Sequence, residues 1–106
     1  MRTLITLSIL CVVSAASATA ADAKAGQMVY NRACKACHGA DGTPNMAIAK
    51  MQKVEMKDLK TAEVQGVSDA EMKTIITDGR GKMKPIRGLT AADVDNVVAY
   101  IRTLKK

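Results

Sequence analysis

Aromatic residues are almost absent from this sequence, which has two tyrosines, no phenylalanine and no tryptophan in 106 residues. A chain of this length forms one small domain, and such a domain usually needs an additional component to complete its core. The same scarcity removes the stacking platforms on which single-stranded nucleic acids bind, and no nucleic-acid recognition motif is present. The sequence therefore predicts a small domain that is not a nucleic-acid binder.

Cysteine and histidine are also few, with three residues and one residue respectively. Two of the cysteines and the histidine form one motif, Cys34-Lys35-Ala36-Cys37-His38. This spacing is typical of haem c attachment, in which the thiols form thioethers and the histidine binds the iron. A redox disulfide, a zinc site and chance are the alternatives. The first usually accompanies a βαβ pattern, which is missing, and zinc needs ligands that this sequence does not supply.

The N-terminal segment, residues 1–20, has the features of a secretory signal peptide. A positive residue near its start is followed by an apolar stretch over 4–16 and a small-residue cleavage site that ends at Ala20. The apolar stretch is shorter than the roughly 20 residues of a membrane-spanning helix. Lipid attachment at Cys11 is the alternative. We expect export, removal of residues 1–20, and a haem domain over 21–106 with no stable membrane anchor.

Positive charges outnumber negative ones, with 16 lysine and arginine residues against 10 acidic residues. Residues 1–20 contain one arginine and no acidic residue, so their removal leaves 15 basic residues against 10 acidic ones, a net charge of +5. Such a basic balance is typical of proteins that bind nucleic acid, an anionic membrane or an acidic protein partner, and nucleic acid is discounted above.

The remaining pattern predicts helices separated by glycine-rich loops. The expected helices span 23–37, 69–78 and 91–104. The first places Gly26, Tyr30, Cys34 and Cys37 on one face. The other two begin after capping-type sequences that start at Ser68 and Thr90. Between the first two helices, residues 45–67 have a weak pattern that indicates short helical turns and loop.

A single histidine leaves the second axial position of the iron to another type of residue. Methionine suits this position, because its neutral thioether stabilises ferrous iron. Met83 lies in a glycine-rich loop between two expected helices, and a loop of this kind can deliver a side chain into a site. Met46, Met51 and Met56 lie in the weakly patterned segment and remain alternatives.

Together these features resemble the monohaem class I cytochromes c, above all the small bacterial and photosynthetic members. The matching residues are Gly26, Tyr30, the Cys34 to His38 motif with Gly39, Asp41 and Gly42, then Gly79, Gly81, Met83 and Pro85, and finally Tyr100, Ile101 and Leu104. The resemblance implies an all-α fold of three to five helices around one covalently bound haem c, with the N- and C-terminal helices crossing.

The resemblance also implies the axial ligands and their surroundings. Met83 would be the distal ligand, although Lys84 separates it from Pro85 where the family has methionine directly followed by proline. In the family, a proline carbonyl accepts a hydrogen bond from the proximal histidine. Pro44 is the proline on that side of the chain, so it is the expected partner of His38.

Four cations surround Met83 in the sequence: Arg80, Lys82, Lys84 and Arg87. If Met83 meets the iron, these cations lie beside the haem edge and attract an acidic redox partner.

An iron whose two axial positions are filled by protein has no open place for a substrate but still transfers one electron. We therefore expect a periplasmic, monomeric electron carrier with one haem c per chain and no enzymatic activity. The alternatives are a small haem sensor or enzyme with an open sixth position, and a cytochrome subunit of a larger dehydrogenase or oxidase.

Overall fold

The computed structural model describes residues 21–105, and the expected signal peptide over 1–20 lies outside them. The helices are α1 (Ala23–Ala33), α2 (Lys35–His38), α3 (Met46–Gln52), α4 (Ala62–Gln65), α5 (Asp69–Asp78) and α6 (Ala91–Thr103). Four of them have seven residues or more, and α2 and α4 are single turns. The expected all-α architecture is confirmed. Within the described residues, no helix is long and apolar enough to cross a membrane.

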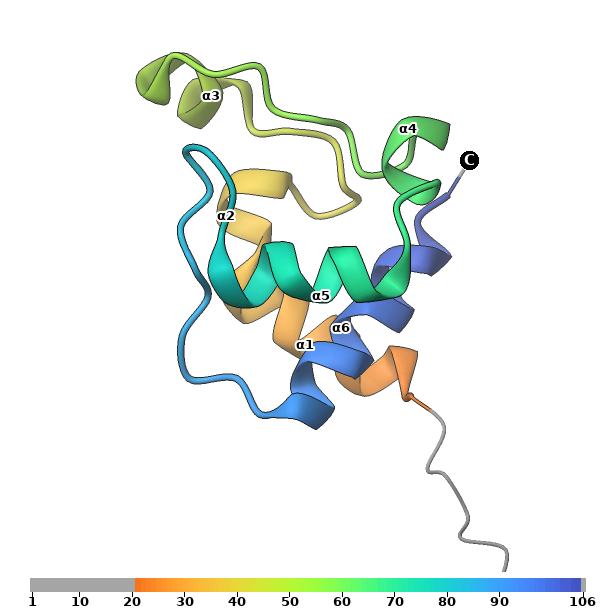
Figure 1. The fold of residues 1–106 in the computed structure, drawn as a ribbon. Coiled ribbons are helices and arrows are strands. Elements are labelled where there is room, and N and C mark those ends of the chain that lie inside the picture. The colour runs from red at the N-terminus through yellow and green to blue at the C-terminus, as the bar shows by residue number, and fades with distance from the viewer. Residues whose placement is uncertain (1–20, 106) are drawn as a thin grey trace, which may run out of the picture.

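Helices α1 and α6 cross below α5 in the view of Figure 1. At the crossing, a Cβ atom on Gly26 would lie 1.9 Å from the carbonyl oxygen of Asn96, so only glycine allows this approach. The Asn96 side chain also accepts a hydrogen bond of 2.8 Å from the backbone N–H of Asp22. Further along, the rings of Tyr30 and Tyr100 pack with their centroids 5.1 Å apart. The predicted contact between the first and last helices is therefore confirmed.

The core lies where α1, α5 and α6 meet. Its buried residues are Val29, Tyr30, Cys34, Met72, Ile76, Val94, Val97, Val98 and Ile101. They form the apolar faces that the helical spacing predicts. Tyr30 is the single aromatic side chain among them, so the three helices bury mostly small aliphatic groups against one another.

The two expected capping boxes differ in the structure. At the start of α6, the Thr90 side chain accepts from the Asp93 N–H, and the Asp93 carboxylate accepts from the Thr90 N–H, each at 3.0 Å. At the start of α5, the Ser68 hydroxyl accepts from the Glu71 N–H at 3.1 Å, which is half of a box. The other half does not form, because the Glu71 carboxylate pairs with Arg80 from the following loop.

The prediction of one continuous helix over 23–37 is wrong, because the chain bends at Cys34. Cys34 has φ −120° and ψ −32°, so α1 ends before it and α2 starts after it. Two tertiary contacts account for the bend. The Cys34 side chain is buried in the core, and the Tyr30 hydroxyl donates a 2.7 Å hydrogen bond to the carbonyl of Gly39. That bond draws the chain after His38 back against α1.

The chain between α2 and α5 contains α3 and α4. In the view of Figure 1 it lies above α5, whereas α1 and α6 cross below α5. Its outgoing and returning parts are joined by a 3.0 Å hydrogen bond from the Leu59 N–H to the Gly42 carbonyl. Lys60 strengthens this junction through the carboxylate of Asp41 and the hydroxyl of Thr43. The expectation of short helical turns and loop over 45–67 is confirmed.

Candidate haem site

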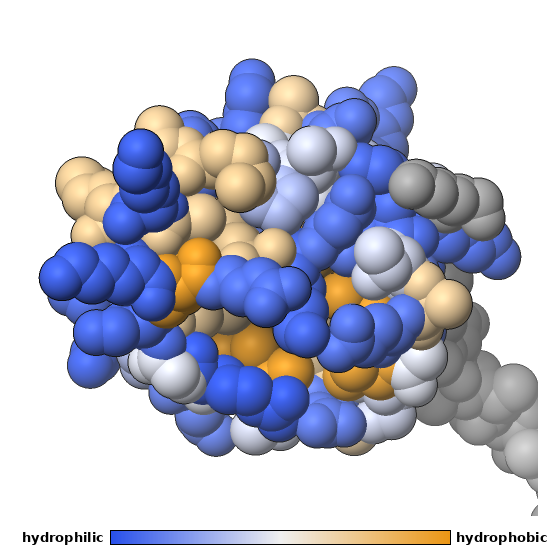
Figure 2. Space-filling model, turned by 90° about the horizontal axis from the view of Figure 1, so that it is seen from above, coloured by the Kyte–Doolittle hydropathy of each residue, from blue (hydrophilic) through white to orange (hydrophobic). Residues whose placement is uncertain are grey.

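A cavity of about 700 Å³ opens between α5, the attachment motif and the returning segment 52–59. Its size lies within the range of about 300–1,000 Å³ that is usual for binding pockets. Apolar side chains form most of the lining, among them Tyr30, Leu59, Val64 and Ile76. Seen from above, apolar residues lie among hydrophilic ones at the surface (Figure 2). The space therefore suits a large, flat, apolar group with an accessible edge.

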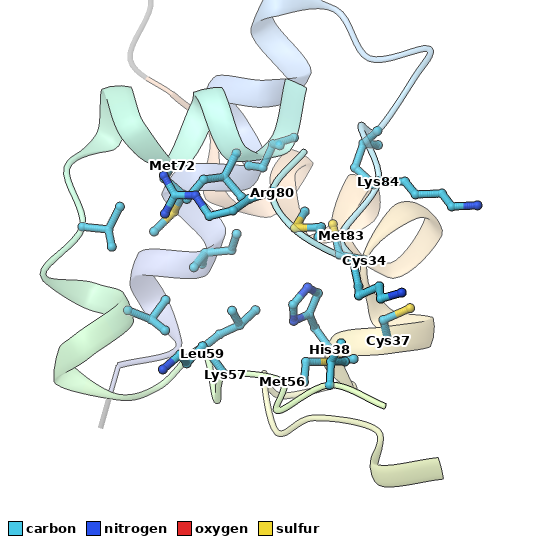
Figure 3. A pocket seen from close by; sticks show the side chains of 18 of the residues that line it. Cys34, Cys37, His38, Met56, Lys57, Leu59, Met72, Arg80, Met83 and Lys84 are labelled. Carbon is cyan, nitrogen blue, oxygen red and sulfur yellow. The ribbon is translucent and has the colours of Figure 1, made fainter. Parts of the chain in front are cut away.

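Both cysteines of the motif and His38 line this cavity. In Figure 3 the imidazole ring of His38 points into the cavity, and the two cysteines lie to one side of it. Both side chains are free thiols, Cys34 buried and Cys37 half-buried. Burial raises the pKa of the Cys34 thiol to about 11. One short segment thus presents two thiols and an imidazole to the same space, as covalent haem attachment requires.

The environment of His38 favours the form that binds iron. Burial lowers the pKa of its imidazole below the ordinary value, and the neutral ring is the metal-binding form. Its Nδ1 atom is buried and has no hydrogen-bond partner within the described residues. An unpaired polar atom of this kind costs free energy in an apolar interior. The neutral imidazole and the two thiols face one apolar cavity, so these residues fit a haem whose iron His38 would hold.

The hydrogen bond that we expected between His38 and Pro44 is not formed, since Nδ1 has no partner. The chain beside Pro44 instead makes backbone contacts with α2. The Asn45 N–H donates to the Cys37 carbonyl at 2.9 Å, and the Asn45 side chain donates to the Ala36 carbonyl at 3.2 Å. These two bonds fix the chain directly after Pro44 against α2, and a bond from His38 to the Pro44 carbonyl in the haem-bound protein stays a prediction.

Met83 lines the same cavity from the loop between α5 and α6. Its backbone is held by two hydrogen bonds with Arg80, of 2.9 and 3.0 Å, and the Ile86 N–H donates to the Ile76 carbonyl at 2.9 Å. In Figure 3 Met83 and Met56 lie on different sides of the His38 ring, and Lys84 extends outward. Although Lys84 lies between Met83 and Pro85 in the sequence, Met83 therefore still faces the cavity.

The methionines that were alternative ligands differ in their exposure to solvent. Met46 and Met51 lie on α3 with 72% and 70% of their surface exposed, and neither lines the cavity. Met56 is half-buried and does line it. Met72 also borders the cavity, but it is buried in the core as its position on α5 predicts. Among the methionines of residues 21–105, only Met56 and Met83 thus line the cavity without belonging to the core.

The four cations near Met83 do not behave alike. Arg80 forms an ion pair of 2.9 Å with Glu71 on α5. Lys82, Lys84 and Arg87 are exposed, and within residues 21–105 none of them makes an ion pair that competes with a partner. Arg80, Lys82 and Lys84 border the cavity, whereas Arg87 does not.

Apart from Met56, an alternative axial ligand, the cavity wall over residues 54–59 was not among the predicted site residues. Val54, Met56 and Leu59 line the cavity with half-buried side chains, and the exposed Glu55 and Lys57, which alternate with them, also border it. Such alternation is typical of an extended, half-buried segment. This alternation was the signal that the sequence offered for the segment, but it is too short to identify a cavity wall without the tertiary structure.

These features define the class of protein: a small helical domain whose attachment motif and loop methionine share one apolar cavity is a c-type cytochrome. The family model described as "Cytochrome C oxidase, cbb3-type, subunit III" matches residues 21–101. The chain belongs to this family, and membership implies a covalently bound haem c and an electron-carrier role.

Individual relatives agree with this assignment. Cytochrome c-554(547) of Halothiobacillus neapolitanus is 33% identical over 92 residues, which cover 81% of this chain and 100% of the relative. Cytochrome c6 of a Picosynechococcus species is 33% identical over 87 residues, covering 79% and 74%. Among solved structures, the KustC0563 c-type cytochrome has a TM-score of 0.67 at 31% identity, covering 76% of this chain and 98% of that chain.

Proposed function

We propose that this protein carries single electrons between redox partners in the periplasm, with one haem c per chain. Cys34 and Cys37 would attach the haem, and His38 and Met83 would be its axial ligands. The observation that supports this best is that these four side chains line one apolar cavity although Met83 is far from the others in sequence. When bound, the haem iron supplies reversible one-electron chemistry.

The protein's own residues would then set the potential and the access to the haem. A thioether ligand and apolar walls both favour the ferrous form and so raise the reduction potential. With both axial positions occupied by side chains, no position is open for oxygen, peroxide or a substrate. This supports a carrier that is not an enzyme.

The family description names an oxidase subunit, and this favours a second candidate function, that of a cytochrome subunit in a larger oxidase. A diffusing carrier is recovered alone in the periplasmic fraction, whereas an oxidase subunit stays with the membranes and co-purifies with the other subunits after mild solubilisation.

The axial ligand can be tested with optical spectra of the haem-loaded protein. We expect a ferric charge-transfer band from methionine sulfur to iron, absent in Met83→Ala and retained in Met56→Ala. Met56→Ala is a matched control because Met56 lines the same cavity. The opposite pattern would assign the ligand to Met56. A wild-type spectrum of high-spin iron that readily binds carbon monoxide would support the sensor or enzyme instead.

The docking surface consists of Lys82, Lys84 and Arg87, with Arg80 at its border. Replacing Lys82, Lys84 and Arg87 with glutamine should lower the association rate with an acidic redox protein by about tenfold at low salt, because long-range attraction is lost. The salt dependence of the rate should also become flatter. Stopped-flow measurements over a range of ionic strength test both effects.

A control triple variant should remove the same charge elsewhere. Lys24, Arg32 and Lys105 are exposed and do not line the cavity. Changing these three to glutamine should affect the rate much less. Equal effects of the two triple variants would show that net charge matters and that the position of the cations does not.

A further inference from the structure

A hydrogen-bond network joins the cavity wall to α6 on the side away from the attachment motif. The Gln65 side chain, at the end of α4, donates from Nε2 to the carbonyl of Leu59 at 2.8 Å and to the carbonyl of Ile101 at 3.0 Å. Both bonds are partly buried. One amide group therefore connects the returning segment of the wall to the C-terminal helix.

Arg102 extends this network from α6. Its guanidinium donates from Nη1 to the carbonyl of Gln65 at 2.7 Å and from Nη2 to the carbonyl of Val67. It also donates from Nε and Nη2 to the Asp69 carboxylate, at 3.0 and 2.8 Å. The Arg102 side chain is 27% exposed, and its planar fork reaches acceptors on three residues, from the end of α4 to the start of α5.

The residues between these anchor points form part of the cavity lining. Leu59, Val64 and Val67 all line it, and two of the accepting carbonyls belong to Leu59 and Val67 themselves. Helix α4 has four residues, and a helix of one turn is not stable by itself. This part of the wall therefore depends on contacts from outside, which Gln65 and Arg102 supply.

We propose that Gln65 and Arg102 are positioning residues that hold this wall against the haem and thereby raise its reduction potential. The proposal rests on the haem occupying the cavity, as in the proposed function. A loosened wall admits water, and water stabilises the additional positive charge of the ferric haem. The protein with the intact network therefore favours the ferrous form more strongly.

Two variants test this without changing the net charge. Gln65→Met keeps the length of the side chain and removes both of its hydrogen bonds. Arg102→Lys keeps the positive charge and removes the fork. In each variant of the haem-loaded protein, we expect the ratio of ferric to ferrous haem at a fixed applied potential to rise about three- to tenfold, where tenfold corresponds to about 59 mV for one electron. Arg32→Lys, at an exposed position outside the cavity lining, is the matched control and should change nothing.

The outcomes separate this inference from the proposed ligation. If both variants lose stability in denaturant but keep the wild-type potential, the network is only structural and the proposal is wrong. If Arg102→Lys does not retain haem, the reduction potential of Gln65→Met alone tests the proposal, because Gln65→Met is the milder change. A methionine–iron band that persists while the potential falls supports the proposal. Absence of that band in the wild-type protein contradicts Met83 ligation and leaves the potential comparison valid.

Discussion

Gly26→Ala is expected to lower the free energy of unfolding by about 3 kcal/mol, at the upper end of the usual cost of overpacking. Alanine normally stabilises a helix by about 1 kcal/mol relative to glycine, so helix propensity alone predicts the opposite sign. Here the added Cβ would lie 1.9 Å from the Asn96 carbonyl oxygen and 2.4 Å from its carbon. Both atoms are backbone, so α1 and α6 would have to separate.

Denaturant unfolding of the haem-loaded protein measures this effect. Gln27→Ala is the control, because Gln27 is the next residue of α1 and is exposed. It should leave the unfolding midpoint unchanged or raise it slightly. If Gly26→Ala is as stable as Gln27→Ala, this result contradicts the close approach of α1 and α6 at Gly26.

Gly39→Ala should cost at least about 3 kcal/mol and should also disturb the haem ligand next to it. Gly39 ends α2 with φ 76° and ψ 167°, a conformation that is essentially restricted to glycine. A Cβ atom there would also lie 2.0 Å from the Thr43 carbonyl oxygen. Because Gly39 directly follows His38, relief of this collision would shift the imidazole from its position in the cavity.

Two measurements on Gly39→Ala separate its effects. Denaturant unfolding reports the loss of stability, and the ferric spectrum reports whether a high-spin fraction appears as His38 moves. Ala40→Ser, at the exposed neighbouring position, should change neither. A destabilised variant with an unchanged spectrum would mean that the turn supports the fold without fixing the ligand. An unaffected unfolding midpoint would contradict the turn geometry itself.

The features that local sequence predicted correctly are those in which every participant lies within a few residues. Thr90 and Asp93 form their capping box within one turn, and the apolar faces of α5 and α6 follow from helical spacing. Cys34, Cys37 and His38 are adjacent, so their shared position in the cavity required little from the rest of the fold. The crossing at Gly26 was expected from the family resemblance, in which the N- and C-terminal helices cross.

The errors came from competition between local and distant partners. Glu71 was expected to complete the box with Ser68, but Arg80 takes its carboxylate. The continuous first helix breaks at Cys34, where burial and the bond from Tyr30 to Gly39 redirect the chain. Local preference cannot weigh partners whose distance depends on the whole fold.

The sequence by itself determined the chemistry of this protein, because the attachment motif is contiguous and its residue types specify haem. The tertiary structure decided the surroundings of that motif. It brought Met83 and the wall over 54–59 to the same cavity and placed Met46 and Met51 in solvent. It also connected Gln65 to Ile101 and Arg102 across distant segments. These contacts depend on how α1, α5 and α6 pack, and no local pattern contains that information.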